Sequence, residues 1–304
     1  MKNTRSVLII AGPTASGKSR LAIDAARAFD GVIINCDAMQ IYKDIPIIAA
    51  TPSEEEKNAA EHRLFELYDA KKRGNVVEWL DLCVAEIRAL WNEQKLPIVV
   101  GGTGMYIDAL INGVTPIPEV PTEIRQHVST MSLPELYAFL EQNDPIMAQK
   151  LHKNDKTRLT RAAEIILFTK RKLSEWYQVP LIKKLPEAEF KVIKIVPQIE
   201  VIEQRCRERL DKMVELGVLE EIATLLKREI DETLPAMKAL GVPELSLAVK
   251  GEMPLSKALE LAKLHTRQYA KRQRTWLKNK LIADIEFTEP YVNQTDWLEK
   301  IKLL

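Results

Sequence analysis

The stretch that most constrains this chain is residues 12–19, which read GPTASGKS. An apolar segment precedes it at residues 7–11, and a helix-like pattern of apolar residues follows it from Leu21 to Phe29. A strand, a glycine-rich turn and a helix in this order match G-x-x-x-x-G-K-[ST], the pattern of a phosphate-binding loop. A chance cluster of Gly, Lys and Ser is the alternative, and the flanking strand and helix favour the loop. The run therefore predicts an α/β fold in which the loop lies at the carboxyl ends of the strands of a parallel sheet.

The chemistry of such a loop comes from its backbone. Consecutive N–H groups point into one concavity, and the helix N-terminus adds positive potential, so an anion binds there. Lys18 would neutralise the outer phosphate oxygens and Ser19 would coordinate Mg²⁺. The pattern predicts a polyphosphate ligand, and it leaves open which one binds and whether a phosphoryl group is transferred. The predicted loop consists of Gly12, Pro13, Thr14, Ala15, Ser16, Gly17, Lys18 and Ser19.

Composition narrows the class of protein. The 304 residues are 46% hydrophobic and 29% charged with a net charge of +1, which is ordinary globular usage without an overall attraction to polyanions. The three cysteines lie far apart, which argues against a disulfide framework or a zinc site and fits a reducing cytosol. No apolar run approaches the roughly 20 residues of a membrane span, and the apolar segment near the N-terminus is too short for an export signal. We expect a cytoplasmic protein without membrane attachment.

Further apolar segments predict more strands of the same sheet. Residues 31–35 and 95–100 read as buried parallel strands, with an amphipathic helix over 76–94 between them. Asp37 follows the first of these strands. Because ligands bind beyond the carboxyl ends of parallel strands, we expect Asp37 to face the same crevice as the loop; a helix N-cap is the alternative role. A second glycine-rich turn at 101–106 follows the other strand and predicts a second wall of one site.

The alternation of strands and helices stops in the middle of the chain. Three prolines lie within residues 116–121, and residues 121–186 read as helices only. A strand pattern returns at 190–196. This order predicts an all-helical insertion, residues 114–186, in a core formed by residues 1–113 and 187–304. The insertion is rich in Lys and Arg, for which RNA contact and an ordinary solvated helix face are equally good explanations.

A strongly basic helix is predicted near the C-terminus. Residues 265–280 hold six Lys or Arg and no acidic residue. Tyr269, Gln273 and Trp276 lie beside these cations, and such a mixture suits an RNA backbone with exposed bases. The alternative is a solvated helix whose two aromatic side chains belong to the core. Four of the cations fall on one helical stripe: Arg267, Lys271, Arg274 and Lys278.

These motifs together resemble those of one family, the bacterial tRNA dimethylallyltransferases, also called tRNA isopentenyltransferases. The matching segments occur in the family's order over nearly the whole chain. The phosphate-binding loop alone is shared by many enzymes, whereas the second glycine turn, the motif in the insertion and the basic helix together are specific. The segments are GPTASGKS (12–19), D-x-x-Q-x-Y (37–42), HRL (62–64), GGTGMYIDAL (101–110), PIP (116–118) with Arg125, LHKNDKTRLTRAAE (151–164), RERLDKMVELG (207–217), ALGVPEL (239–245) and TRQYAKRQRTWLK (266–278).

The resemblance implies a P-loop kinase-like core with a parallel sheet and an all-helical insertion that clasps an anticodon loop. It implies transfer of a dimethylallyl group from dimethylallyl diphosphate to the exocyclic amine of the adenosine 3′ to the anticodon, in tRNAs that read codons beginning with U. The loop is of the nucleotide-binding, ATP-binding type, yet in this family it holds the allyl diphosphate and no ATP is hydrolysed. The implied partners are a tRNA anticodon stem-loop, dimethylallyl diphosphate and Mg²⁺, and we expect a monomer without an obligate protein partner.

Matched position by position, the resemblance also assigns roles. Asp37 corresponds to the aspartate proposed as general base on the adenine amine, and Arg209 to an arginine that binds diphosphate. Lys18 and Ser19 are the catalytic positions of the loop, with Mg²⁺ at Ser19. The target adenosine is expected to leave its stack to reach the site. The positions that correspond to tRNA contacts are Asp37, Ala38, Met39, Gln40, Thr103, Arg125, Thr157, Arg158, Leu159, Thr160, Arg161, Lys238, Gly241, Lys271, Arg272, Gln273, Arg274, Thr275, Trp276, Leu277 and Lys278.

Three segments depart from the family pattern. Ala38 stands where Ser is frequent, and Ala49-Ala50-Thr51-Pro52 stands where Gly-Thr-Ala-Lys-Pro is usual. Leu240-Gly241-Val242-Pro243 replaces Ile-Gly-Tyr-Arg. These changes remove a hydroxyl, a lysine and an aromatic–arginine pair, so we expect tRNA affinity to differ from that of the family. None of them affects Asp37, Lys18 or Arg209, and we therefore expect an active enzyme.

Two other functions remain open at the level of sequence. A small-molecule kinase of the P-loop class would need an adenine pocket and an arginine-bearing lid, and the basic helix would have no role in it. A non-catalytic tRNA-binding protein would bind tRNA without forming product.

Overall fold

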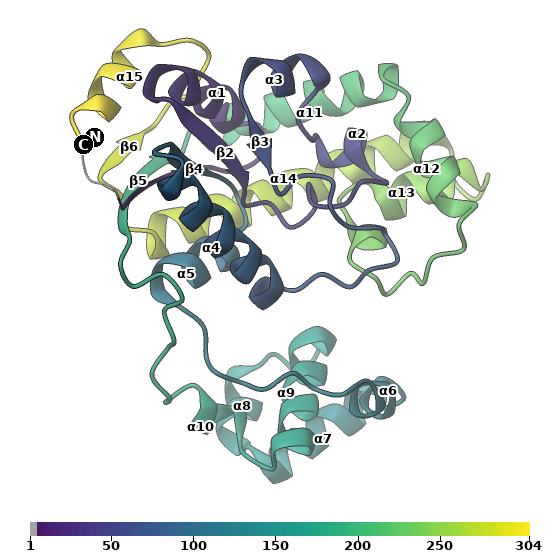
Figure 1. The fold of residues 1–304 in the computed structure, drawn as a ribbon. Helices are drawn as coiled ribbons and strands as arrows, with labels where there is room; N and C mark the ends of the chain where they lie inside the picture. Colours follow the sequence, from purple (N-terminus) through teal and green to yellow (C-terminus); the bar gives the residue numbers. More distant parts are fainter. Residues whose placement is uncertain (1–4) are drawn as a thin grey trace. The chain divides into compact units, whose positions relative to one another are not determined.

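The computed structural model describes residues 5–304. A six-stranded, all-parallel sheet in the order β3-β2-β4-β1-β5-β6 forms its centre (Figure 1). Parallel neighbours need helical crossovers, and this order therefore places helices on both faces of the sheet. The strands are β1 (Ser6–Ala11), β2 (Gly31–Asn35), β3 (His62–Arg63), β4 (Leu96–Gly101), β5 (Glu189–Ile195) and β6 (Ile285–Phe287).

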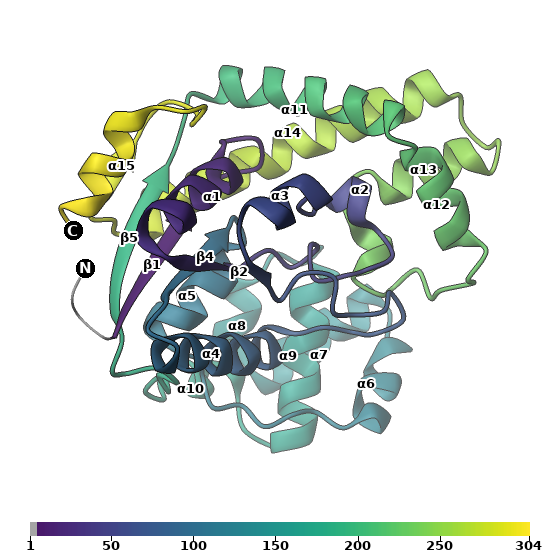
Figure 2. The same ribbon diagram turned by 45° about the horizontal axis from the view of Figure 1, so that its top comes forward.

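Alternate side chains of each strand serve the two faces of the sheet. Leu8 and Ile10 of β1 pack with buried residues of α1 and α15 in one apolar cluster (Figure 2). The helices of this core are α1 (Lys18–Phe29), α2 (Pro46–Ala49), α3 (Glu54–Ala59), α4 (Val76–Asn92), α5 (Gly104–Asn112), α11 (Ile199–Glu215), α12 (Val218–Leu226), the 3₁₀ helix η1 (Ala236–Lys238), α13 (Val242–Val249), α14 (Leu255–Lys280) and α15 (Thr295–Lys302).

The chain divides into two compact units. Asn112–Lys183 forms one, and the described residues up to Ile111 with Lys184–Leu304 form the other. The smaller unit is all-helical, with a buried core that includes Val128, Leu140 and Leu159. The observed boundaries lie within three residues of those expected at 114 and 186. The helices of the smaller unit are α6 (Thr122–Ser129), α7 (Leu133–Asn143), α8 (Pro145–Lys150), α9 (Lys156–Thr169) and α10 (Leu173–Trp176).

The two ends of the smaller unit are joined to each other. Val114 and Ile182 form an antiparallel bridge in which each backbone N–H donates to the other residue's carbonyl, at 3.1 and 2.9 Å. Gly113, with a φ of 96°, immediately precedes this bridge. The first and last segments of the unit are therefore held side by side.

Several elements differ from the sequence-based expectation. Val77, in the first turn of the amphipathic helix α4, is apolar and yet 41% exposed. The glycine turn after β4 leads directly into helix α5, which was not predicted because its first residues were read as part of the turn. The short elements α2, α10, η1 and α13 were not predicted, since three to eight residues carry too little periodicity to identify. No helix among residues 5–304 is both long and apolar enough to cross a membrane.

Candidate active site

The carboxyl ends of three neighbouring strands bring the predicted site segments together. The phosphate-binding loop follows β1, Asp37 follows β2, and the second glycine turn follows β4. Gly12 N donates to Gly101 O at 3.3 Å, which joins the two glycine-rich segments directly. Ala38 N donates to Thr103 Oγ1 at 3.1 Å, which joins the segment after Asp37 to the second turn. The three segments therefore share one edge of the sheet, as the strand order dictates.

The loop has the backbone geometry of an anion cradle. Gly17 adopts a left-handed conformation with a φ of 88° immediately before α1, and a Cβ at this position would lie 2.2 Å from Tyr291 O. Only glycine fits such a position without strain. Ala15 also has a positive φ, of 63°. The fully buried Ser16 hydroxyl has no hydrogen-bond partner among the described residues.

Two arginines of α11 hold the loop from outside. The Arg209 guanidinium donates to Thr14 Oγ1, and Arg205 Nε donates to Ala15 O at 2.8 Å. Lys18 Nζ donates to Pro13 O at 3.3 Å across the loop. Two half-buried cations thus lie at the loop, Lys18 at its C-terminal end and Arg209 on α11.

Burial controls the ionisation of these cations. Desolvation lowers the pKa of Lys18 to about 8; the Asp37 charge opposes this shift and the Arg209 charge adds to it. Desolvation also lowers the pKa of Arg209, against the charges of Cys206 and Asp37. Charged groups that are partly withdrawn from water gain most from an anion placed between them. The loop is therefore built to receive a negatively charged group.

Asp37 is held in a defined orientation. Its N–H donates to Oδ1 of the fully buried Asn35 at 2.8 Å, and its own Oδ1 accepts from Met39 N at 2.9 Å. The carboxylate therefore caps a turn, and the alternative role as a helix N-cap is wrong because residues 38–41 form no helix. Its Oδ2 has no hydrogen-bond partner among the described residues. A fixed carboxylate with one available oxygen is suited to accept a proton.

At the second glycine turn the backbone passes very close to the segments that follow β2 and β1. A Cβ on Gly101 would lie 2.0 Å from Cys36 O, and one on Gly102 would lie 2.7 Å from Gly12 O. A Cβ on Gly104 would lie 2.4 Å from the Trp276 ring of α14. These contacts explain why the turn is glycine-rich, since any side chain would separate the strand ends.

We expect Gly101→Ala to lower the free energy of unfolding by about 3 kcal/mol, because the added methyl group meets backbone atoms that cannot move aside. Urea denaturation followed by circular dichroism would measure the loss. Gly74→Ala is the matched control: its Cβ would meet side-chain atoms and no backbone, namely the Tyr68 ring at 3.0 Å and the Tyr42 hydroxyl oxygen at 3.1 Å. Equal midpoints for the two variants would contradict the close approach as the cause.

The basic helix is α14, and its cations do not form the continuous stripe that was predicted. Arg267 Nε lies 2.7 Å from Glu203 Oε2 of α11, and Arg274 Nε donates to Pro197 O at 2.8 Å. These two arginines hold α14 against the segment that includes α11. Figures 1 and 2 show α11 and α14 running side by side. The exposed face of α14 includes Arg267, Lys271 and Lys278 of the predicted stripe, whereas Arg274 is half-buried.

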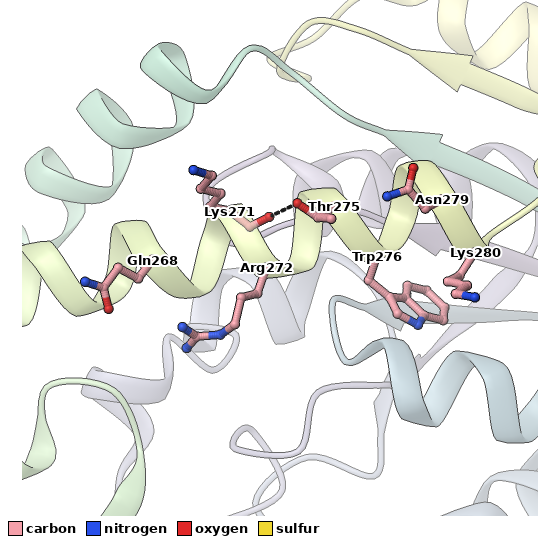
Figure 3. A pocket seen from close by; sticks show the side chains of 7 residues that line it. All are labelled: Gln268, Lys271, Arg272, Thr275, Trp276, Asn279 and Lys280. Atoms are coloured by element: carbon pink, nitrogen blue, oxygen red, sulfur yellow. Dashed lines mark hydrogen bonds between the residues drawn. The ribbon is translucent and has the colours of Figure 1, made fainter. Parts of the chain in front are cut away.

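That exposed face borders an open hollow of about 560 Å³. Arg272 and Trp276 extend from the same side of the helix (Figure 3). Thr275 Oγ1 is occupied by a hydrogen bond to Lys271 O at 2.9 Å. Cations, amides and a half-buried indole on one face form a surface suited to RNA. The hollow is lined by Gln268, Lys271, Arg272, Thr275, Trp276, Asn279 and Lys280.

Three positions predicted to contact tRNA are buried, and their side chains cannot do so. Leu159 and Leu277 are 0% exposed in the cores of their units. Gly241 is buried with a φ of 92° at the start of α13, where its role is to turn the backbone. Val242, in the segment that departs from the family pattern, is also fully buried, so its replacement of an aromatic residue concerns packing.

Gln273 is a further correction. It is only 6% exposed, and both polar atoms of its side chain are bonded inside the protein, to Thr14 and Gly102. Gln40 is half-buried and donates to Ala49 O at 3.2 Å and Ala50 O at 2.6 Å. The departure at 49–50 therefore leaves this contact intact, because Gln40 uses backbone carbonyls.

The remaining predicted contacts keep solvent access. Thr157, Arg158 and Arg161 are exposed on α9, Thr160 is half-buried there, and Arg125 is half-buried on α6. Arg158 pairs with Asp155 at 3.4 Å and Arg161 with Glu164 at 3.3 Å, both at the surface, where such pairs contribute little and are readily exchanged. Lys238, Lys271, Arg272 and Lys278 are exposed in the core unit.

Sequence reasoning missed Asn35 and Arg205, and it placed Tyr269 only on the RNA surface and not near Asp37. Asn35 could have been found as a polar residue at the end of an otherwise apolar strand. The Tyr269 ring is half-buried on α14, and its hydroxyl group lies near Thr103 and Gln273. Burial, together with the Asp37 charge, raises the pKa of this hydroxyl group to about 12. Nothing in the local pattern distinguishes Arg205 from the other cations of α11.

Comparison with known proteins agrees with this arrangement. A family model described as IPP transferase matches residues 40–280. The tRNA dimethylallyltransferase of Zymomonas mobilis is 41% identical over 92% of each chain, and that of Rickettsia massiliae is 37% identical over 98% of this chain and 83% of its own.

Solved structures give the same relationship. The tRNA isopentenylpyrophosphate transferase of Bacillus halodurans has a TM-score of 0.71 and 28% identity, over 98% of this chain and 94% of its own. A eukaryotic dimethylallyltransferase acting on tRNA has a TM-score of 0.81 and 29% identity, over 98% of this chain and 77% of its own. With its phosphate-binding loop, second glycine turn and basic helix in the family's order, the chain belongs to the tRNA dimethylallyltransferase family.

Proposed function

We infer that this protein transfers a dimethylallyl group from dimethylallyl diphosphate to tRNA. The acceptor is the exocyclic amine of the adenosine on the 3′ side of the anticodon. The observation that carries this inference is the shared sheet edge, where the charge of Asp37 acts on both Lys18 of the loop and Arg209 of α11, which binds the loop. A carboxylate opposite an anion cradle supplies both halves of the reaction, a proton acceptor for the amine and a binding site for the leaving diphosphate.

The reaction follows from these positions. The bond between the allylic carbon and the diphosphate oxygen breaks, and its electron pair leaves with the diphosphate. The adenine nitrogen forms a bond to the same carbon and gives up a proton, which the Asp37 carboxylate accepts. Lys18 and Arg209 stabilise the charge that grows on the leaving group, because they are already positioned and partly desolvated before it develops.

We propose that Mg²⁺ accompanies the diphosphate. No cluster of three or more His, Cys, Asp or Glu side chains able to hold a metal occurs in the part of the chain that the structure describes. The Ser19 hydroxyl lies in the first turn of α1, at the loop. Mg²⁺ takes one or two protein oxygens and completes its shell with phosphate oxygens and water, so this donor fits. When bound, the ion would neutralise charge on the diphosphate.

We assign RNA binding to the exposed face of α14 and to the cations of α6 and α9. Lys271, Arg272 and Lys278 have no ion-pair partner among the described residues, and Arg272 lies over the Tyr269 ring at 5.7 Å. Cations without an ion-pair partner can bind RNA phosphates, and the half-buried indole beside them can stack on a base. We propose that the protein acts as a monomer in the cytoplasm.

The proposed function is tested with an unmodified anticodon stem-loop, dimethylallyl diphosphate and Mg²⁺. We expect mass spectrometry to show one adenosine that has gained a dimethylallyl group and inorganic diphosphate in equal amount. ATP turnover in the absence of RNA would instead identify a small-molecule kinase. Tight stem-loop binding without product would identify a non-catalytic RNA-binding protein.

A further inference from the structure

Gln273 occupies a position between the two halves of the site. Its Oε1 accepts from Thr14 N of the phosphate-binding loop at 2.9 Å. Its Nε2 donates to Gly102 O of the second glycine turn at 2.9 Å. The side chain is 6% exposed, and both of its polar atoms are satisfied by backbone groups of these two segments. One amide therefore connects two segments that lie 88 residues apart in the chain, 14 and 102.

The two bonds belong to a longer chain of contacts. From Gly102 the turn continues to Thr103, whose Oγ1 accepts from Ala38 N next to Asp37. On the other side, Thr14 is also bound through its hydroxyl by Arg209. In addition to the direct bond from Gly12 N to Gly101 O, the loop that receives diphosphate and the segment that carries the base are therefore linked through the side chain of one residue of α14. The same helix presents Lys271 and Arg272 to solvent beside Gln273.

The space around the Gln273 side chain is closely filled. A Cβ on Gly102 would lie 2.4 Å from Gln273 Nε2, so the amide fills the room that the glycine provides. The neighbouring Ala270 and Leu277 are fully buried and fix the same face of α14. A side chain held in this way transmits the position of the helix to both segments.

We propose that Gln273 is a positioning residue that sets the distance between the diphosphate loop and the base-bearing wall of the site. It does not contact RNA. This inference rests on the proposed function, because the two segments matter as donor and acceptor halves of one reaction. A small displacement between reacting groups is costly: about 1 Å corresponds to roughly a 100-fold loss of rate.

The test uses Gln273→Met, which keeps the volume and removes both hydrogen bonds. We expect kcat for stem-loop prenylation to fall about 100-fold, while the Kd for the stem-loop changes less than about twofold. Lys257→Ala, an exposed change on the same helix, should leave both unchanged. Lys271→Ala should show the opposite pattern, with weaker and less salt-dependent RNA binding. Weaker RNA binding by Gln273→Met with an unchanged kcat would overturn the proposal and make Gln273 an RNA contact.

A second variant remains decisive if Gln273→Met proves unstable in a thermal melt. In Gln273→Glu, a protonated carboxyl group can accept from Thr14 N and donate to Gly102 O, whereas the ionised form repels that carbonyl. Its activity relative to the wild type should therefore rise as pH falls from about 9 to about 6. A ratio that is independent of pH would overturn the proposal.

A binding measurement that does not depend on catalysis distinguishes a failure of the proposed function from a failure of the positioning role of Gln273. If the wild type forms no product, the proposed function fails while the positioning role is still tested by the Kd for inorganic diphosphate from calorimetry. We expect this Kd to rise about tenfold in Gln273→Met, since the loop loses one of its holding bonds, and to stay constant in Lys257→Ala. Equal affinity in the wild type and Gln273→Met would overturn the positioning role.

Discussion

Asp37→Asn is expected to lower kcat for prenyl transfer about 1,000-fold, within the range that a general base contributes. Asn has the same shape and keeps an oxygen for the hydrogen bond from Met39 N, so the turn after β2 should persist. What it loses is the ability to accept the amine proton. Single-turnover measurements with saturating stem-loop and dimethylallyl diphosphate would report the loss directly, because product release does not contribute to them.

RNA binding distinguishes this loss from a structural one. The Kd for the stem-loop should change less than about twofold, since the free cations of α14 are untouched. Asp30→Asn is the matched control, because Asp30 is an exposed carboxylate that precedes β2, at the opposite end of the strand from Asp37. A turnover within about threefold of the wild type for Asp37→Asn would show that another group accepts the proton.

Lys18→Met should lower kcat/KM by about 100-fold or more at neutral pH, the loss typical of removing one stabiliser of a developing anion. The wild-type pH dependence provides a second signature. Lys18 is protonated below its pKa of about 8, so the affinity of the free enzyme for inorganic diphosphate should be highest below that pH and should fall as pH rises through it. Steady-state kinetics of stem-loop prenylation would measure the first effect, and calorimetry with inorganic diphosphate across this pH range would measure the second.

The Lys18→Met variant should lack that fall in affinity, because the group that titrates has been removed. Arg20→Met tests whether any cation of α1 has the same influence, since Arg20 is exposed and pairs with Asp24. We expect wild-type behaviour from it. A decline in diphosphate affinity above pH 8 that persists in Lys18→Met would assign the titration to a different group.

The elements nearest the site could be predicted from sequence because their signals are local. A glycine-rich turn between an apolar strand and a helix defines the loop, and Asp37 follows from the rule that parallel strands end at the site. The capping box of Ser53 and Glu56 at the start of α3 is a local signal of the same kind, because its two partners lie three residues apart. The all-parallel sheet and the family were also confirmed.

Long-range contacts could not be predicted, because periodicity gives the faces of a helix without the partner of each face. Arg267 and Arg274 share a stripe with Lys271 in sequence, yet Glu203 and the Pro197 carbonyl engage them in the structure. Gln273 reads as one more polar residue of a basic helix. Its acceptor bond to Thr14 spans 259 residues, and no local pattern encodes such a contact.

The paired backbone at Val114 and Ile182 bears on how this chain folds. Because the ends of the helical unit are pinned together, its contacts are local and its core can form before the long-range strand pairs of the sheet are complete. Because the chain enters and leaves this unit at neighbouring points, the unit adds little to the loop-closure entropy that must be lost when β4 and β5 join the same sheet. The helical unit is therefore a module that can change length or sequence without disturbing the order in which the sheet assembles.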